Sequence, residues 1–158
     1  MTEANCQPTL VDVGIVDVNC GPGVRIVRPA NVYGCTIGAR TFVGPFVEIQ
    51  RGVRIGADCR IQSHSFLCEL LTIGDRCFIG HGAMFVNDPF RSGGPARGDR
   101  TQWGAIVLGN DISIGSNATI MPVRLADGVV VGAGAVVTRD LTERGIYAGN
   151  PARLLRKL

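Results

Sequence analysis

Residues 37–85 read IGARTF VGPFVE IQRGVR IGADCR IQSHSF LCELLT IGDRCF IGHGAM F, and every group of six begins with an aliphatic or aromatic residue. These residues are Ile37, Val43, Ile49, Ile55, Ile61, Leu67, Ile73, Ile79 and Phe85. A second column, four residues further on, is mostly small or aliphatic: Thr41, Val47, Val53, Cys59, Ser65, Leu71, Cys77 and Ala83. A period of six predicts a short strand followed by a corner, with both columns pointing inward.

Three six-residue units close one triangular coil, so residues eighteen apart stack at about one strand spacing, roughly 4.8 Å. The repeat therefore predicts an all-β fold, a parallel β-helix whose core is a column of aliphatic ladders. After an interruption the pattern resumes at Leu108, Ile114 and Ile120, then slips by one residue to Leu125, Val131 and Val137. The slip predicts one tightened corner.

The length of 158 residues suits a single domain. Its predicted parts are irregular first coils (1–36), regular coils (37–87), an extruded loop (88–104), final coils (105–142) and a short C-terminal cap (143–158). The loop segment is too rich in Gly, Pro and charge to pack as a strand. A long loop anchored in a regular scaffold favours a functional role. The segment 154–158 is expected to form a helical turn.

Composition excludes several classes of protein. There is no signal-peptide pattern and no apolar run near the ~18 residues that span a bilayer, so we expect a cytoplasmic protein without a membrane partner. Lys and Arg are scattered and the net charge is +3, which is no nucleic-acid signature but suits anionic small ligands. Six Cys without a CxxC pair predict buried free thiols, with Cys59 and Cys77 stacked in the core.

The repeat, together with VGAGAVV at 131–137 and GNPAR at 149–153, resembles the hexapeptide-repeat acyltransferases over roughly residues 31–156. Within that superfamily, the stretches 42–50, 60–64 and 78–88 resemble the branch that N-acetylates nucleotide-linked amino sugars. The resemblance implies a left-handed coil and a homotrimer. It also implies that acetyl-CoA, the co-substrate, lies in the groove between neighbouring subunits, so that one chain holds half of each site.

Acetyl transfer to an amine needs an acceptor for the proton that the amine sheds and donors for the oxyanion that forms. His64 and His81, the two histidines of the chain, are predicted to share one corner of adjacent coils, because residue 82 lies eighteen after His64. Histidine takes up a proton around neutral pH. His81 is therefore the first candidate general base and His64 the second. The alternatives are solvated corner histidines and, as the branch implies, a reaction without a protein base.

Four further candidates concern the acceptor. Asn87 aligns with an Asn that lies beside the acceptor amine in the resembling branch, and its amide can both accept and donate. Its alternative role is to open a turn before Asp88, whose carboxylate could hold the amine by charge. Glu48 and Gln62 are polar residues at or near corners, where the sugar or its nucleotide could rest.

The candidates for the cofactor come from the resemblance. The family pattern places Ala133 and Gly134 along the pantetheine arm, and Asn150 and Arg153 near the nucleotide end. An Arg can grip a phosphate with its fork of donors. A solvated cap residue is the alternative for Arg153.

No metal site is predicted, and three other functions stay open. The first is an O-acetyltransferase of the same fold, with a hydroxyl as acceptor. The second is a γ-class zinc carbonic anhydrase, whose three-histidine site two histidines per chain would not supply. The third is a non-catalytic β-helix scaffold subunit, which gives no reason for the long polar loop.

Overall fold

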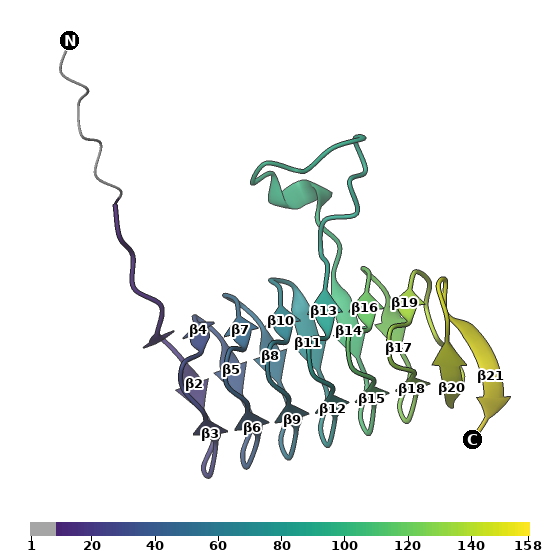
Figure 1. Cartoon of the computed structure of the whole chain (residues 1–158), viewed down its shortest axis with the longest axis horizontal. Coiled ribbons are helices and arrows are strands. Elements are labelled where there is room, and N and C mark those ends of the chain that lie inside the picture. The colour runs from purple at the N-terminus through teal and green to yellow at the C-terminus, as the bar shows by residue number, and fades with distance from the viewer. Residues whose placement is uncertain (1–8) are drawn as a thin grey trace.

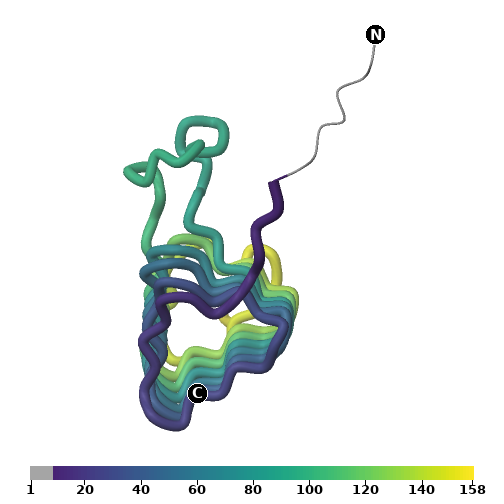
Figure 2. Tube along the Cα trace, turned by 90° about the vertical axis from the view of Figure 1, so that its left-hand side faces the viewer, coloured from purple at the N-terminus to yellow at the C-terminus, as the bar shows by residue number. Residues whose placement is uncertain are grey.

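The structure is a computed structural model of the chain, and it describes residues 9–158. Strands β1–β21 wind into a parallel β-solenoid of triangular cross-section, as predicted (Figures 1 and 2). Seen from the N-terminal end in Figure 2, the chain turns anticlockwise as it recedes, so the coil is left-handed. Across residues 9–158, none of the helical structure has the length and apolar character needed to cross a bilayer.

Three sheets form the three faces of the prism. Sheet A consists of β1 (Ile15–Val16), β4 (Asn31–Tyr33), β7 (Glu48–Ile49), β10 (Phe66–Leu67), β13 (Met84–Phe85), β16 (Thr119–Ile120) and β19 (Val136–Val137). Sheet B consists of β2 (Asn19–Cys20), β5 (Thr36–Ile37), β8 (Arg54–Ile55), β11 (Leu71–Ile73), β14 (Ile106–Leu108) and β17 (Arg124–Leu125). Sheet C consists of β3 (Arg25–Ile26), β6 (Phe42–Val43), β9 (Arg60–Ile61), β12 (Phe78–Ile79), β15 (Ser113–Ile114), β18 (Val130–Val131), β20 (Gly145–Ala148) and β21 (Arg153–Lys157).

Both predicted inward columns are confirmed, because every residue assigned to them is buried. Parallel pairing stacks identical side chains of successive coils on one another: Ile37 pairs with Ile55, and Ile55 pairs with Ile73. Each such aliphatic side chain, moved fully out of water, stabilises the fold by about 1.5–3 kcal/mol. The core is therefore a continuous ladder running along the axis of the solenoid.

Most of the buried cysteines lie in the same columns, and Cys68 directly follows the column residue Leu67. Cys35, Cys59, Cys68 and Cys77 are buried and free, and the stacking of Cys59 on Cys77 is confirmed by a 3.4 Å hydrogen bond from the Cys77 N–H to the Cys59 Sγ. Burial raises the pKa of the Cys68 thiol to about 12. Cys20 corrects the prediction: it is exposed, because it lies in the first coil, which has no coil on its N-terminal side. Cys6 lies outside the described residues.

The chain turns at three corners, named here by the sheets they join in chain order: A–B, B–C and C–A. At the B–C corner, successive coils place charged residues in the left-handed backbone region: Arg40, Asp58, Arg76 and Asp111. The strain of that conformation is accompanied by alternating ion pairs, Arg40 with Asp58 at 2.5 Å and Arg76 with Asp111 at 2.7 Å. Charge pairing therefore joins the coils two by two along the middle of this edge of the prism.

Variation in length is confined to the A–B corner. From each inward residue to the next, the B–C and C–A corners always take six residues, whereas the A–B corner takes five from Val32 to Ile37 and six from Ile49 to Ile55. The predicted tightened corner is confirmed, since Ile120 and Leu125 are also five apart. The long loop leaves the same corner, between β13 and β14, and carries the 3-10 helix Arg100–Gln102 (Figure 1).

The predicted C-terminal helical turn was wrong. Arg153–Lys157 forms the strand β21, which pairs antiparallel with β20 and so covers the open edge of sheet C. A segment this short has too few hydrogen bonds to sustain a helix. The unpaired backbone groups of β20 offer it partners at once.

Candidate active site

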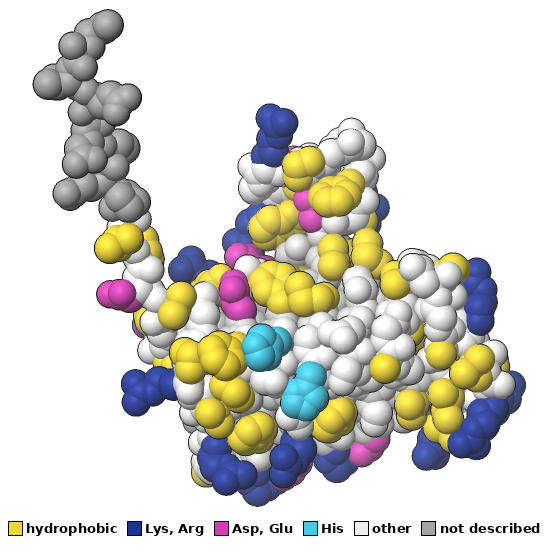
Figure 3. Space-filling model, viewed as in Figure 1, with side chains coloured by type: hydrophobic (Ala, Val, Ile, Leu, Met, Phe, Trp, Pro, Cys, Tyr) yellow, Lys and Arg dark blue, Asp and Glu magenta, His cyan; other side chains and the backbone are white. Residues whose placement is uncertain are grey.

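The C–A corner brings the two histidines together. His64 lies between β9 and β10, and His81 lies between β12 and β13 in the next coil. Their predicted placement on one corner is confirmed, because the His81 Nδ1 lies 2.8 Å from the Oγ of Ser63, the neighbour of His64. Both imidazoles are exposed and appear side by side on the face shown in Figure 3.

Ser63 fixes the His81 ring in a way that suits proton transfer. In the tautomer that carries its proton on Nδ1, this N–H donates to the Ser63 Oγ, and the Nε2 lone pair is left for a substrate proton. An oriented neutral imidazole is what general-base catalysis requires. Ser63 is not among the predicted site residues, and its eighteen-residue spacing from His81 is the sequence signal for this contact.

His64 has a different environment. Its ring stacks on Phe46 of the preceding coil, with the ring centroids 4.9 Å apart and the planes inclined by 26°. Phe46 is itself 57% exposed, so the two rings form an aromatic surface beside His81. A stacked ring is suited to contact a flat ligand, which favours a binding role for His64.

The residues predicted for the cofactor lie further along the same corner. Ala133 and Gly134 lie between β18 and β19, and both are exposed. Asn150 follows in the closing turn, where the Val136 N–H donates to the Gly149 carbonyl at 2.9 Å. Ala133 lies two coils from His81 and Asn150 about three, which correspond to about 10 and 14 Å at one strand spacing per coil. Five predicted residues therefore form one axial row: His64, His81, Ala133, Gly134 and Asn150.

Arg153 begins β21 just beyond that row. Its Nη1 donates to the Ala152 carbonyl at 3.1 Å, and the side chain is exposed at the C-terminal end of the solenoid. The guanidinium is therefore held near one end of the row, where it can reach an anionic group.

The A–B corner holds a second group. The Asn87 Nδ2 donates to the Glu69 carbonyl at 3.1 Å, and the Asn87 carbonyl accepts from the Gly104 N–H at 2.8 Å. Asn87 thus closes the base of the loop. Asp88 accepts from the N–H groups of Phe90 and Ala96 at 3.0 and 2.7 Å. Both its oxygens therefore order the loop, and an amine would compete with these bonds.

Glu48 and Gln62 have separate surroundings. Glu48 projects from sheet A, and its Oε1 accepts from the Gln50 Nε2 at 3.2 Å. Burial, followed by the nearby Glu48 and Glu69 carboxylates, raises the pKa of Tyr33 on the same face. Gln62 is half-buried on the C–A corner beside Ser63. Glu48 therefore belongs to the acidic side of sheet A, and Gln62 to the histidine side.

The structure separates His81 from Asn87. The two residues stand at opposite edges of sheet A, with β13 between them. Six residues at about 3.3 Å each place them up to about 20 Å apart. Within one chain they do not reach the same atom, because six residues span one whole face of the prism.

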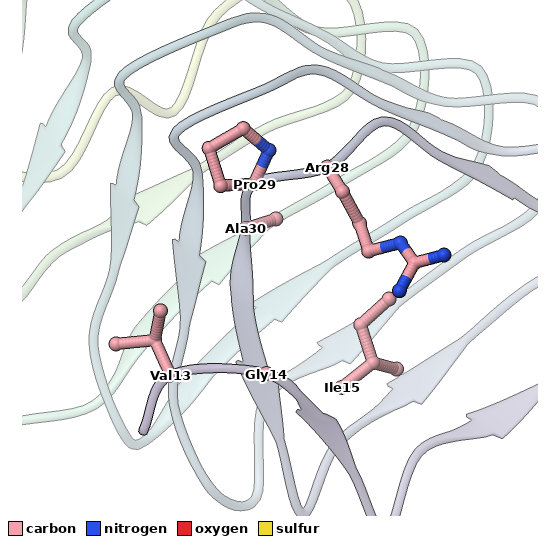
Figure 4. A pocket seen from close by; sticks show the side chains of 6 residues that line it. All are labelled: Val13, Gly14, Ile15, Arg28, Pro29 and Ala30. Carbon is pink, nitrogen blue, oxygen red and sulfur yellow. The ribbon is translucent and has the colours of Figure 1, made fainter. Parts of the chain in front are cut away.

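Hollows in the surface lie near the N-terminal end, and two of them bear on the site. A hollow of about 530 Å³ is lined by Val13, Gly14, Ile15, Arg28, Pro29 and Ala30, and Figure 4 shows the Arg28 side chain extending beside Ile15. This hollow reflects the uncovered first coil and does not include the histidines. A smaller one of about 230 Å³ is lined by residues that include Asn31, Phe46 and Glu48, and it adjoins the aromatic surface. Within residues 9–158, no three His, Cys, Asp or Glu side chains gather as a metal site would require.

The left-handed solenoid of six-residue repeats, with its extruded loop and its polar row along one corner, has the architecture expected for the hexapeptide-repeat transferases (Figure 2). Residues 34–68 match the family described as bacterial transferase hexapeptide (six repeats). Residues 71–86 and 105–139 match the family described as hexapeptide repeat of succinyl-transferase. The matches together cover more than half of the chain, which belongs to the hexapeptide-repeat transferase superfamily.

Several known proteins resemble the chain. A chloramphenicol acetyltransferase of Agrobacterium fabrum is 35% identical over 115 residues, which are 56% of this chain and 52% of that protein. A probable macrolide acetyltransferase of Lysinibacillus sphaericus is 32% identical over 124 residues, with coverages of 61% and 66%. The chain thus spans about half to two thirds of these relatives. A variant of AntD, an N-acyltransferase from Bacillus cereus solved with dTDP and coenzyme A, superposes with a TM-score of 0.79 at 25% identity, covering 88% and 82% of the two chains.

Proposed function

We propose that the protein transfers the acetyl group of acetyl-CoA to the amine of a nucleotide-linked amino sugar. The observation that carries this proposal is the axial row on the C–A corner, in which an oriented histidine leads to the residues predicted for the cofactor. AntD supports it, since this N-acyltransferase has also been solved with dTDP-4-amino-4,6-dideoxyglucose and coenzyme A. The stretches 42–50, 60–64 and 78–88 support the same acceptor class.

In the proposed reaction the neutral amine attacks the thioester carbonyl, and the C–S bond breaks as the amide forms. The Nε2 of His81 takes the proton that the amine sheds, while Ser63 holds the ring. The proton then passes to the leaving thiolate of coenzyme A. His81 would return to its neutral form, so no further reagent is needed.

The cofactor would lie along the C–A corner. The exposed backbone of Ala133 and Gly134 would run beside the pantetheine arm, and Asn150 with Arg153 would meet the nucleotide end. A guanidinium binds phosphate through charge-assisted, often paired hydrogen bonds. The thioester would then point toward His81, at the other end of the same row.

Asn87 enters the proposed site through a homotrimer. It lies about one prism face away from His81, so a shared site requires that the A–B corner of one subunit faces the C–A corner of its neighbour. Each interface would then combine His81 and the cofactor row from one chain with Asn87 from another. The amide of Asn87 can hold the acceptor amine at such a boundary.

O-acetylation of a hydroxyl acceptor is the second candidate. The observation that favours it is the 35% identity to a chloramphenicol acetyltransferase, which exceeds the identity to AntD. An oriented imidazole would serve a hydroxyl as well as an amine. The acceptor therefore decides between the two candidates.

The test is a panel of UDP-linked and dTDP-linked amino sugars with acetyl-CoA, with chloramphenicol as the hydroxyl acceptor. Products are identified by mass and not by a thiol reagent, because the exposed Cys20 would react with the reagent. We expect an acetylated amino sugar whose formation depends on acetyl-CoA. Acetylation of chloramphenicol alone would establish the second candidate instead.

A further inference from the structure

The extruded loop is internally ordered. The carboxylate of Asp88 accepts two backbone N–H groups in its first half. Asp99 does the same for the second half, accepting from the Thr101 N–H and hydroxyl and from the Gln102 Nε2. The Ser92 hydroxyl joins the halves by donating to the Gln102 Oε1 at 2.9 Å. These hydrogen bonds join the two halves, so the loop behaves as one structural unit.

One residue of the solenoid, Glu69, holds this unit by its side chain. The Arg100 Nη2 lies 2.5 Å from the Glu69 Oε2, as an ion pair without a well-directed hydrogen bond, and the Arg100 guanidinium also lies 5.7 Å from the centre of the Trp103 ring. The Glu69 side chain is only 20% exposed and its Oε2 is inaccessible to solvent. An inaccessible carboxylate oxygen depends on its partner far more than a surface one does.

The backbone of Glu69 holds Asn87 at the same time. Its carbonyl accepts from the Asn87 Nδ2 at 3.1 Å, and its N–H donates to the Gln50 Oε1 at 3.2 Å. The preceding coil therefore fixes Glu69, and Glu69 fixes both the loop and the amide of Asn87. These two contacts use different atoms, so substitutions can separate them.

We infer that Glu69 is a positioning residue, whose carboxylate latches the extruded loop over the A–B corner while its carbonyl orients Asn87 toward the acceptor. The part of this inference that concerns the acceptor rests on the proposed function. The latch does not rest on the proposed function, because it consists of the ion pair between Glu69 and Arg100. A loop held down beside Asn87 would restrict where an acceptor can enter and would keep the Asn87 amide in one rotamer.

The latch is tested by trypsin cleavage after Arg91 and Arg97, both in the loop, followed by mass analysis. Arg100→Met leaves the Glu69 carboxylate without its cation, and we expect cleavage about tenfold faster, less than for a fully buried pair because Arg100 is 58% exposed. Glu69→Gln keeps an acceptor for Arg100, so about threefold is expected. Arg100→Lys preserves the charge and should restore a rate near that of the native chain.

Asp58→Asn is the matched control. It removes an exposed ion pair with Arg40 on the B–C corner, so it should leave loop cleavage unchanged. Native-like cleavage in both Arg100→Met and Glu69→Gln would overturn the latch. A uniform acceleration that includes Asp58→Asn would also overturn it, because the effect would then be global.

The positioning role has its own measurement. In Arg100→Met we expect kcat with the amino-sugar acceptor to fall at least threefold while the KM for acetyl-CoA stays unchanged, and Arg100→Lys should recover kcat. An opened loop with unchanged kcat would overturn the positioning role. If the native chain acetylates no amino sugar, the proposed function fails, and the cleavage rates alone decide whether the latch exists.

Discussion

Replacement of His81 by Ala removes the imidazole that the structure orients through the 2.8 Å contact with Ser63. A positioned general base contributes about 10²–10⁴ in rate. His81 is exposed and has one described partner, so we expect the low end, a fall in kcat of about 100-fold. The loss is expected in kcat with little change in the KM for acetyl-CoA, because His81 would accept the amine's proton in the transition state and would not bind the cofactor.

Ser63→Ala gives a second, smaller step of the same prediction. One neutral hydrogen bond contributes about 0.5–1.5 kcal/mol, which corresponds to a loss of about two- to tenfold. Because Ser63 would act only through His81, the double variant should be no slower than His81→Ala. The assay is steady-state formation of acetylated amino sugar by the native chain, the two single variants and the double variant.

A clear result would refute this reasoning. His81→Ala with the native rate would mean that His81 is not the general base. The control is the free energy of unfolding, which should change by less than about 0.5 kcal/mol because the side chain is exposed. Equal losses in Ser63→Ala and His81→Ala would point instead to a distorted corner.

Three predictions concern the solenoid. Phe85→Ala removes a fully buried ring from the core and should lower the free energy of unfolding by about 3–5 kcal/mol in urea titration. Gly56→Ala places a Cβ 2.6 Å from the backbone of the next coil and should be clearly destabilising in the same assay, whereas Gly94→Ala, with open space around it, should be nearly neutral. Hydrogen bonds from arginines lower the folded pKa of Asp58 and Asp111, so their contribution is complete above the unfolded pKa near 3.9 and is lost as pH falls through the folded pKa. The double variant Asp58→Asn, Asp111→Asn should lose less thermal stability than the native chain as the pH falls below about 4. An equally steep loss in both proteins would contradict the ion-pair assignment.

Much of the fold follows from periodicity, because each inward residue is specified again one coil later. The same arithmetic places His64 and His81 on one corner and predicts the shortened corner after Ile120. These features depend only on the position of a residue within a coil, and that position can be counted from the sequence. The other members of the row, Ala133, Gly134 and Asn150, came from the family resemblance, and the structure places them on the corner that carries His81.

Other features depend on contacts that no period encodes. The strand at 153–157 forms because β20 leaves an open edge, which is a property of the end of the stack. The exposure of Cys20 has the same origin at the other end. The roles of Asp88 and Glu69 depend on how a loop without a repeat folds back, and its side-chain partners were not visible from spacing.

The confinement of length changes to the A–B corner has a consequence for how such a chain can vary. An insertion at the B–C or C–A corner would shift the charge ladder or the histidine row out of stack, whereas the A–B corner already accommodates spacings of five and six residues and a long loop. Segments exchanged there leave the core columns and the proposed cofactor row in register. The prism thus separates a constant edge for the proposed acetyl donor from a variable edge on which a new acceptor preference can arise by loop replacement.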